Sequence, residues 1–530
     1  MPHRTIDVLW LIPAGLALSL WLSHLLFFDT GFAVWDPSDQ MDLAQLARNI
    51  SEGKGFVSSV SRPLEQRFTP GLPHPELARG PGLPLLLGSF MALFGENRSV
   101  LLLPLGLLHA ICAASTALFA HLLTRDRIVG ILAGILYASS PLALLYATNV
   151  SVEIPYATLI LLSLLFFQWA PTGHLPQVTA WIVAGFFLGL ASTFRFSAAF
   201  FLPALLLPRL ILTRESPRKK GSFLLWTLLG LSLPLVPLLL RNIIATGHFT
   251  SPVYRYTPLL SPGVPQGYAL WCSLTLPEPP PLIPDLTSAW TSLIQAVRLL
   301  PKVTSARIWL AGLAGIFLLA RRQNAWLLAL AILFTVHLGT SILVGHPSLR
   351  YGSFLLPLIC ALAGVTAGTL VRLLPGRCMG MAILLGSLFL TWPWIPSASQ
   401  RETARWARQT DPYRQATRWV SQHLPPGATI LTDIPWPLAW YGNYQACWLT
   451  RRPGEVKDLI EFLDLDAIVL TDLHTQGCIG WTEEWVTILN RPAWATYMLP
   501  GTWESLPQEE ENMKILILKP SHLFSSVPVD

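Results

Sequence analysis

Residues 100–123 read VLLLPLGLLHAICAASTALFAHLL and contain no Asp, Glu, Lys or Arg. The hydrocarbon core of a bilayer is about 30 Å thick, so a helix needs roughly 20 apolar residues to cross it. A soluble core does not require apolar runs of that length. The stretch therefore predicts a membrane-spanning helix. Comparable runs predict further spans at Val8–Phe28, Ile128–Ala147, Ile154–Trp169, Ser222–Leu240, Trp326–Val344 and Tyr351–Val371.

The composition of the whole chain agrees with this interpretation. Of its 530 residues, 52% are apolar and 12% are charged, whereas roughly 25% of residues are charged in soluble proteins. The net charge of +6 is spread over the loops and requires no nucleic-acid partner. Leu83–Phe94 is too short to span and predicts a helix in the interface. Shorter apolar runs bring the expected total to about eleven spans: Val178–Thr193, Phe196–Leu212, Ile308–Ala320 and Met379–Trp394.

Basic residues in the short loops predict the orientation of the spans. Cytoplasmic loops retain Lys and Arg, and an N-terminus inside the cell places the most basic short loops on the cytoplasmic side. No small-residue cleavage site follows the first apolar run, so we expect that run to remain as a span. The predicted cytoplasmic loops are Thr124–Arg127, Arg214–Lys220, Arg321–Asn324 and Arg372–Arg377.

This orientation places three long segments outside the membrane. They are the loops 29–97 and 241–307 and the tail, so we predict a transmembrane domain over residues 1–398 and a small extracytoplasmic α/β domain over 399–530. The second loop is rich in Pro and is predicted to be irregular. The tail alternates helical and strand-like periodicities. Its expected elements are helices at Tyr413–Leu424, Val456–Leu463 and Glu483–Leu489 and strands at Ala428–Thr432, Ala467–Thr471 and Ile515–Leu518.

The first external loop begins with an acidic segment, Trp35-Asp36-Pro37-Ser38-Asp39. The apolar residues that follow, from Leu43 to Ile50, recur at helical spacing and predict an amphipathic helix along the membrane. Asp36 before Pro37 fits an N-cap, and Asp39 would lie in the first turn, where the helix dipole stabilises a carboxylate. Capping and dipole roles account for both acids on the sequence pattern alone.

Other charged residues recur at the external ends of the spans. Glu153 lies between two spans, where a carboxylate is costly unless it has a partner or a water-filled cavity. Each arginine there can be explained singly as an interface anchor. Taken together, external carboxylates and several external arginines predict a site that binds an anionic headgroup beside a general base. The arginines are Arg79, Arg195, Arg241 and Arg350.

The order of motifs resembles the GT-C superfamily of membrane glycosyltransferases that use polyprenyl-phosphate sugars. The members include protein O-mannosyltransferases and the lipid A aminoarabinose transferase. The resemblance rests on Asp39, on Ala47-Arg48-Asn49, on the turn Gly53-Lys54-Gly55-Phe56 and on the segment from Arg79 to Pro84, Arg-Gly-Pro-Gly-Leu-Pro. In that last segment the family usually has Arg-Pro-Pro-Gly-Tyr-Pro. This chain therefore departs from the family pattern at Gly80 and Leu83.

The resemblance implies roles for individual residues. Asp39 would be the catalytic base, with Asp36 as the alternative if the register shifts by three residues. Glu153 would orient the acceptor or the base. Arg79 would hold the donor phosphate. The residues that would assist Arg79 in donor binding are Arg350, Tyr351, Arg195 and Arg241.

The implied protein is an α-helical polytopic membrane enzyme of GT-C type in the bacterial plasma (inner) membrane. It would transfer a hexosyl or pentosyl group, with inversion, from a polyprenyl phosphate to a lipid, glycan or protein acceptor. The sugar and the acceptor are not encoded in any linear motif. Other readings are a transporter or flippase, an oligosaccharide ligase, and a non-catalytic GT-C-like scaffold. The tail lacks the Trp-Trp-Asp-Tyr-Gly motif of oligosaccharyltransferases.

Metal and disulfide chemistry have little support in the sequence. The six cysteines have no metal-ligand spacing, and a disulfide between Cys447 and Cys478 stays open. Some GT-C enzymes bind a divalent cation and others need none. The only candidate metal ligands near Arg79 are His74 and Glu76. We therefore expect no required cofactor, with a divalent cation as the alternative.

Overall fold

The computed structural model describes most of the chain. The described residues are 8–28, 39–169, 176–256, 270–276, 278, 286–303, 306–320, 324–344, 350, 352–373, 412–473, 482–500, 502–510 and 513–520.

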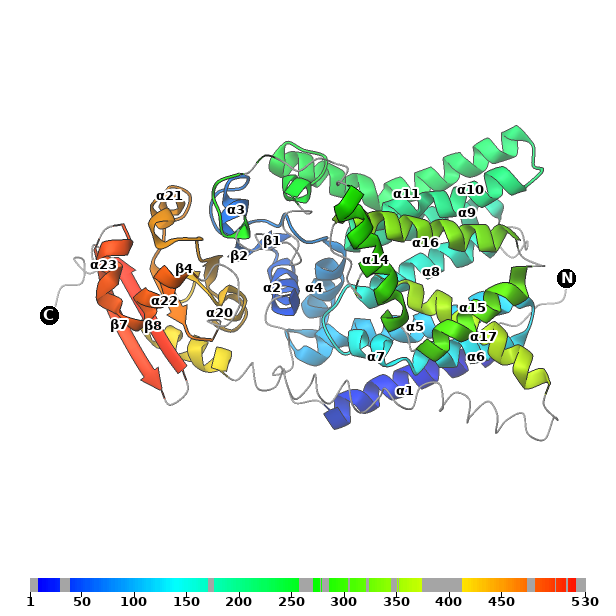
Figure 1. The fold of residues 1–530 in the computed structure, drawn as a ribbon, viewed down its shortest axis with the longest axis horizontal. Coiled ribbons are helices and arrows are strands. Elements are labelled where there is room, and N and C mark those ends of the chain that lie inside the picture. Colours follow the sequence, from blue (N-terminus) through cyan, green and yellow to red (C-terminus); the bar gives the residue numbers. More distant parts are fainter. Residues whose placement is uncertain are drawn as a thin grey trace.

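Long apolar helices form one half of the molecule, and a mixed sheet lies at its other end (Figure 1). Within the described residues, four helices are long and apolar enough to cross a membrane, namely α5 (Arg98–Thr124), α9 (Gln177–Phe194), α11 (Pro217–Thr246) and α17 (Leu355–Arg372). Further apolar helices include α1 (Leu11–Phe28), α8 (Glu153–Trp169), α10 (Leu202–Leu212), α15 (Ala306–Ala320) and α16 (Asn324–Val344). The total of eleven spans stays a prediction, and its member Met379–Trp394 lies outside the described residues.

The predicted span Ile128–Ala147 is broken in the structure. It forms α6 (Arg127–Ala138) and α7 (Pro141–Ala147), which are bent by 58° and would make a fifth span if counted as one. The break falls immediately before Pro141, whose ring has no N–H to continue the helical hydrogen bonds. Phe196–Leu212 is also divided, because a 3-10 turn (Phe196–Phe201) precedes α10.

Glycines allow the helices α9 and α11 to pack backbone to backbone. A Cβ on Gly185 would lie 2.0 Å from the Thr227 carbonyl oxygen, and one on Gly230 would lie 2.0 Å from the Ile182 carbonyl oxygen. Small residues that permit such approach are typical of helix contacts in membranes. This pair holds Arg195, just after α9, and Arg241, near the end of α11, at one end of the bundle.

The helix predicted after Asp39 is present as α2 (Asp39–Ser51). It does not lie along a membrane surface with a free polar face, because every residue from Met41 to Asn49 is buried. The helix lies between α4 (Gly82–Phe94) and α20 (Pro435–Gly442) (Figure 1). Its polar side is covered because Arg48 donates from Nη1 to the Trp440 carbonyl oxygen over 2.9 Å and lies 4.0 Å from that indole ring.

The sheet contains six strands in the order β2-β5-β4-β6-β8-β7. Its edge strand β2 (Val60–Ser61) comes from the first long loop and runs parallel to β5 (Gln445–Trp448), with Val60 opposite Ala446. The strands β5, β4 (Thr429–Thr432) and β6 (Ala467–Thr471) run parallel to one another. The strand β8 (Met513–Pro520) is antiparallel to β6, and β7 (Trp503–Glu510) is antiparallel to β8. The first loop and the tail therefore share one sheet.

The elements around the sheet follow the alternation predicted for the tail. Residues 412–423 are helical, and short helices follow at α21 (Val456–Ile460), α22 (Glu483–Asn490) and α23 (Ala495–Met498). The first loop adds β1 (Val57–Ser58), α3 (Pro63–Gln66) and β3 (His74–Pro75). Cys447 is buried and unpaired in β5, and Cys478 lies outside the described residues.

The second long loop is more regular than predicted. The helix α11 continues five residues past Arg241, and Leu286–Val303 forms the 18-residue helix α14. The alternation of apolar and polar residues in α14 suits a helix with one packed face, and it contacts α15 and α16. The prolines between 277 and 284 lie outside the described residues. The prediction of irregular structure was therefore wrong for the segment that follows these prolines, which is helical.

Candidate active site

Two carboxylates on one face of α2 form the centre of the site. Asp39 and Asp42 lie three residues apart in the first turn, so both side chains point the same way. Arg79 meets both: its Nη2 donates to Asp39 Oδ1 over 2.5 Å and its Nε donates to Asp42 Oδ2 over 3.0 Å. The guanidinium of Arg79 is therefore fixed by two carboxylates at once.

A second arginine joins this centre to the membrane helices. Arg350 donates from Nη1 to Asp39 Oδ2 and from Nε to Glu153 Oε1, the latter over 2.8 Å. Glu153, the first residue of α8, is 0% exposed, and its Oε1 also accepts from Arg195 Nη2 over 2.6 Å. Its other oxygen, Oε2, is buried and has no hydrogen-bond partner within the described part of the chain.

Both oxygens of Asp39 are thus occupied by guanidinium groups. Burial alone would raise the pKa of the Asp39 carboxyl, but Arg79 and Arg350 outweigh it and hold the pKa well below its ordinary value. Burial would conversely lower the pKa of either arginine, and the carboxylates outweigh it and raise both. All three groups are charged at neutral pH. The Asp39 side chain is nevertheless 24% exposed, so a ligand can reach it.

A buried group behind Asp42 was not predicted from the sequence. Arg62 donates from Nη2 to Asp42 Oδ2 over 3.4 Å and from Nη1 to Glu65 Oε1 over 2.9 Å. The Arg62 guanidinium also lies 4.7 Å from the ring of Trp271 and 5.0 Å from that of Trp448. The three-residue spacing of Asp39 and Asp42 could have indicated that both carboxylates share one face of a helix. Nothing in the sequence shows that Arg62 contacts that helix.

Glu76 closes the turn that carries Arg79. Its Oε1 accepts from the backbone N–H groups of Ala78 and Arg79 over 2.6 and 2.8 Å. Burial, assisted by the carboxylates of Asp42 and Glu65, raises the pKa of Glu76 to about 7. Glu76 therefore fixes the backbone of Arg79 and changes charge near neutral pH.

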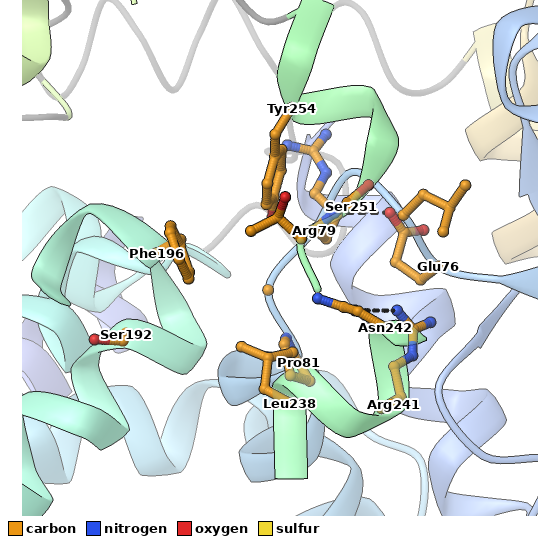
Figure 2. A pocket seen from close by; sticks show the side chains of 13 residues that line it. Glu76, Arg79, Pro81, Ser192, Phe196, Leu238, Arg241, Asn242, Ser251 and Tyr254 are labelled. Carbon is orange, nitrogen blue, oxygen red and sulfur yellow. Dashed lines mark hydrogen bonds between the residues drawn. The ribbon is translucent and has the colours of Figure 1, made fainter. Parts of the chain in front are cut away.

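A pocket lies beside Arg79. Figure 2 shows Arg241 and Asn242 from α11 and Tyr254 from the turn that follows it around this space. Arg241 donates to the Asn242 amide oxygen over 3.2 Å and to the Phe56 carbonyl oxygen over 3.4 Å. It forms no ion pair with a carboxylate in the described part of the chain, so its charge is available to an anion.

The departure from the family pattern at Gly80 has a packing reason. A Cβ on Gly80 would lie 2.3 Å from the carbonyl oxygen of Thr193 and 2.9 Å from that of Phe194. These are the last residues of α9. A proline has no room at this position, and the glycine lets the Arg79 segment lie directly on the end of α9.

The remaining predicted site residues are Asp36, Tyr351 and His74. Asp36 and Tyr351 lie outside the described residues. His74 is buried, and its ring contacts the carbonyl oxygens of Pro75 and Val60 at 2.9 and 3.2 Å. Among the described residues, no group of three or more His, Cys, Asp and Glu could hold a metal ion, so His74 and Glu76 have no third ligand there.

Comparison with known proteins gives a consistent class. The sequence model of the family described as dolichyl-phosphate-mannose-protein mannosyltransferase matches residues 74–240, a segment that contains Arg79, Glu153 and Arg195. No protein of curated function matches the chain in sequence.

Solved structures resemble the whole chain at low identity. ArnT from Cupriavidus metallidurans, bound to undecaprenyl phosphate, has a TM-score of 0.62 at 11% identity and covers 96% of this chain and 97% of its own. The oligosaccharyltransferase of Archaeoglobus fulgidus with Zn and sulfate has a TM-score of 0.59 at 13% identity, with 94% and 71% covered. The same enzyme with an inhibitory peptide and a dolichol-phosphate has a TM-score of 0.56 at 12% identity, with 98% and 74% covered.

These likenesses define the fold. The chain has the fold of the GT-C superfamily of membrane glycosyltransferases. The predicted resemblance is confirmed at this level.

Proposed function

We propose that this protein transfers a sugar from a polyprenyl-phosphate donor to an acceptor at the external membrane face. The observation that carries the proposal is the Asp39 carboxylate held between Arg79 and Arg350. Guanidinium groups bind phosphate as readily as carboxylate. A donor phosphate would therefore compete for both arginines and leave Asp39 free beside the reacting centre.

The charges of the site favour an anionic ligand. Asp39, Asp42 and Glu153 are balanced by Arg79, Arg350 and Arg195. Arg241 adds a positive charge beside the pocket at Arg79, which the Glu76 carboxyl also lines. A phosphate there would gain charge-assisted hydrogen bonds in a partly buried place, where they are stronger than in water.

The reaction follows from these positions. The acceptor hydroxyl or amine would lose its proton to Asp39 as its oxygen or nitrogen attacks the anomeric carbon. The bond from that carbon to the phosphate oxygen breaks, the anomeric configuration inverts, and polyprenyl phosphate leaves with the bonding electrons. Arg79 and Arg350 would stabilise the charge that grows on the phosphate. Once those arginines bind phosphate, the pKa of Asp39 rises toward the range of a general base.

Glu153 would support the other side of the site. Its Oε1 orients Arg350 and Arg195, and its buried Oε2 would accept a hydrogen bond from a hydroxyl of the sugar or the acceptor. The proposal assigns no step to a metal. A divalent cation stays an alternative, because a structure of similar fold contains Zn.

The proposed location is a bacterial plasma membrane, with the site and the tail outside the cytoplasm. The ends of helices α10 and α17 lie away from the sheet in Figure 1, and Arg372 at the end of α17 pairs with Asp126. Of the predicted basic loops, Thr124–Arg127 therefore lies at the same end of the bundle as Arg372, which supports the proposed orientation. We propose the domain limits 1–398 and 399–530, with β2 as the strand that joins the two parts.

A second candidate function is oligosaccharide transfer, which the likeness in fold to the Archaeoglobus fulgidus enzyme favours. Both functions use a lipid-linked donor, so the products separate them. Mass spectrometry of glycolipids and glycoproteins from cells with and without the protein would show one added sugar or a whole glycan.

The test of the proposal is the Asp39→Asn variant, which keeps the shape of the side chain and removes the base. We expect transfer to be lost while the protein accumulates in membranes as the wild type does. The matched control is Glu215→Gln. It removes a carboxylate whose Oε1 accepts a 2.6 Å hydrogen bond from Arg209, away from the site, and it should retain activity. Unchanged transfer in Asp39→Asn would overturn the proposal.

A further inference from the structure

The Asp42 side chain lies behind the proposed phosphate site without facing its ligand. It is 1% exposed and sits one helical turn after Asp39. Its Oδ2 accepts the Nε–H of Arg79 over 3.0 Å. Asp42 therefore touches the phosphate-binding arginine, whereas Asp39 touches both that arginine and the space for a ligand.

The two carboxylates hold different edges of the Arg79 guanidinium. Asp39 takes Nη2 and Asp42 takes Nε, while Nη1 makes no hydrogen bond within the part of the chain that the structure describes. A phosphate that displaces Asp39 would leave the Nε contact intact. The plane of the guanidinium would then be fixed by Asp42 alone.

Asp42 is itself held from behind. Arg62 approaches its Oδ2 to 3.4 Å, and Gln45 approaches its Oδ1 to 3.4 Å. Arg62 is in turn paired with Glu65 and covered by Trp448 of β5. The orientation of Arg79 thus depends on a chain of contacts that reaches the sheet, and a rigid supporting shell is what precise ligand geometry requires.

We infer that Asp42 is a positioning residue, which keeps the Arg79 guanidinium aimed at the donor phosphate during the exchange of partners at Asp39. The inference rests on the proposed function. It assigns to Asp42 no contact with the substrate and no transfer of a proton. Its effect should appear in the affinity for the phosphate group and in KM for the donor.

The experiment measures binding of undecaprenyl phosphate to the purified full-length protein in nanodiscs. Asp42→Asn should weaken binding by about tenfold, the range expected for loss of one charge-assisted hydrogen bond. The matched control is Asp433→Asn, the same chemical change at a carboxylate that contacts Thr471 and not Arg79. We expect a clearly smaller loss of affinity in this control.

A double-variant cycle separates positioning from general loss of structure. In an Arg79→Lys background there is no guanidinium to orient, so Asp42→Asn should weaken binding by little more. The inference would be overturned if Asp42→Asn weakened binding in the Arg79→Lys background as much as it does in the wild type. It would also be overturned if Asp42→Asn bound undecaprenyl phosphate as tightly as the wild type. Lack of binding by the wild type would instead overturn the proposed function, and the inference with it.

Discussion

Arginine–carboxylate pairs occur at both ends of the helical bundle, but they are built differently. Near α2, Arg79 and Arg350 each contact two carboxylates, and Asp39 and Glu153 each contact two arginines. At the other end, Asp126 pairs with Arg372, whose side chain is 61% exposed. Shared partners in a buried network depend on one another, whereas an exposed pair contributes little.

The two kinds of ion pair differ in what happens when one partner is lost. Replacing Asp126 leaves Arg372 with its charge in water. Replacing one partner of the shared network leaves buried charges uncompensated, which is costly. Under the proposed function, a phosphate would enter that network because it offers the arginines an equivalent partner. The comparison can be tested by removing charges from each end.

The largest effect is expected for Arg350→Ala, which removes the link between Asp39 and Glu153. We expect transfer to fall by about 100-fold or more, since one stabilising contact to developing charge contributes about that much. The rate would be measured with a saturating donor in proteoliposomes. An Arg350→Ala enzyme within a factor of three of the wild type would contradict the shared-network interpretation.

An intermediate effect is expected for Glu76→Gln, and it depends on pH. The folded state raises the pKa of Glu76 to about 7, above its ordinary value of roughly 4.3. The folded protein therefore binds a proton that the unfolded chain has released, and the stability of the wild type falls as the pH rises from about 5 to 7. Glutamine keeps an acceptor for the Ala78 and Arg79 N–H groups and has no proton to lose.

The melting temperature of Glu76→Gln should therefore rise relative to that of the wild type as the pH rises through this window. Thermal unfolding in detergent at several pH values would measure it. The control is Glu52→Gln, which alters an exposed pair with Lys54 and should run parallel to the wild type. A constant difference between Glu76→Gln and the wild type would show that Glu76 does not titrate there.

The smallest effect is expected for Asp126→Asn at the opposite end. Asparagine can still cap α6, since Asp126 Oδ1 accepts the Ile128 N–H over 3.0 Å. The lost ion pair involves an exposed Arg372, so we expect about 1 kcal/mol or less in unfolding free energy and no change in transfer. A large loss of activity would mean that both ends of the bundle contribute to the site.

The sequence predicted the elements better than their contacts. Apolar runs gave the positions of the long helices, because the thickness of a bilayer dictates their length. The strands of the tail also followed from period-two patterns. The burial of α2 was missed, because the pattern from Leu43 to Ile50 describes one apolar face and does not reveal that α20 covers the other.

The site shows the same limit. Motif order singled out Asp39, Arg79 and Glu153 as candidates, and the position of Arg350 before a span added it. The structure brings these four side chains together, and their roles stay a prediction. The role of Arg62 was not accessible, because its partner Asp42 lies 20 residues away and the two meet only once β2 joins β5. Long-range contacts of this kind depend on tertiary folding and leave no local pattern.

The glycine at position 80 has a mechanical consequence. Its backbone lies against the carbonyl groups of Thr193 and Phe194 with no side chain between them, and side chains are what usually absorb small shifts between packed segments. A sub-ångström displacement of the end of α9 would therefore pass directly to Arg79. The membrane helices and the arginine that we propose to bind phosphate would move as one body, so changes in bilayer thickness that tilt α9 would be felt at the site.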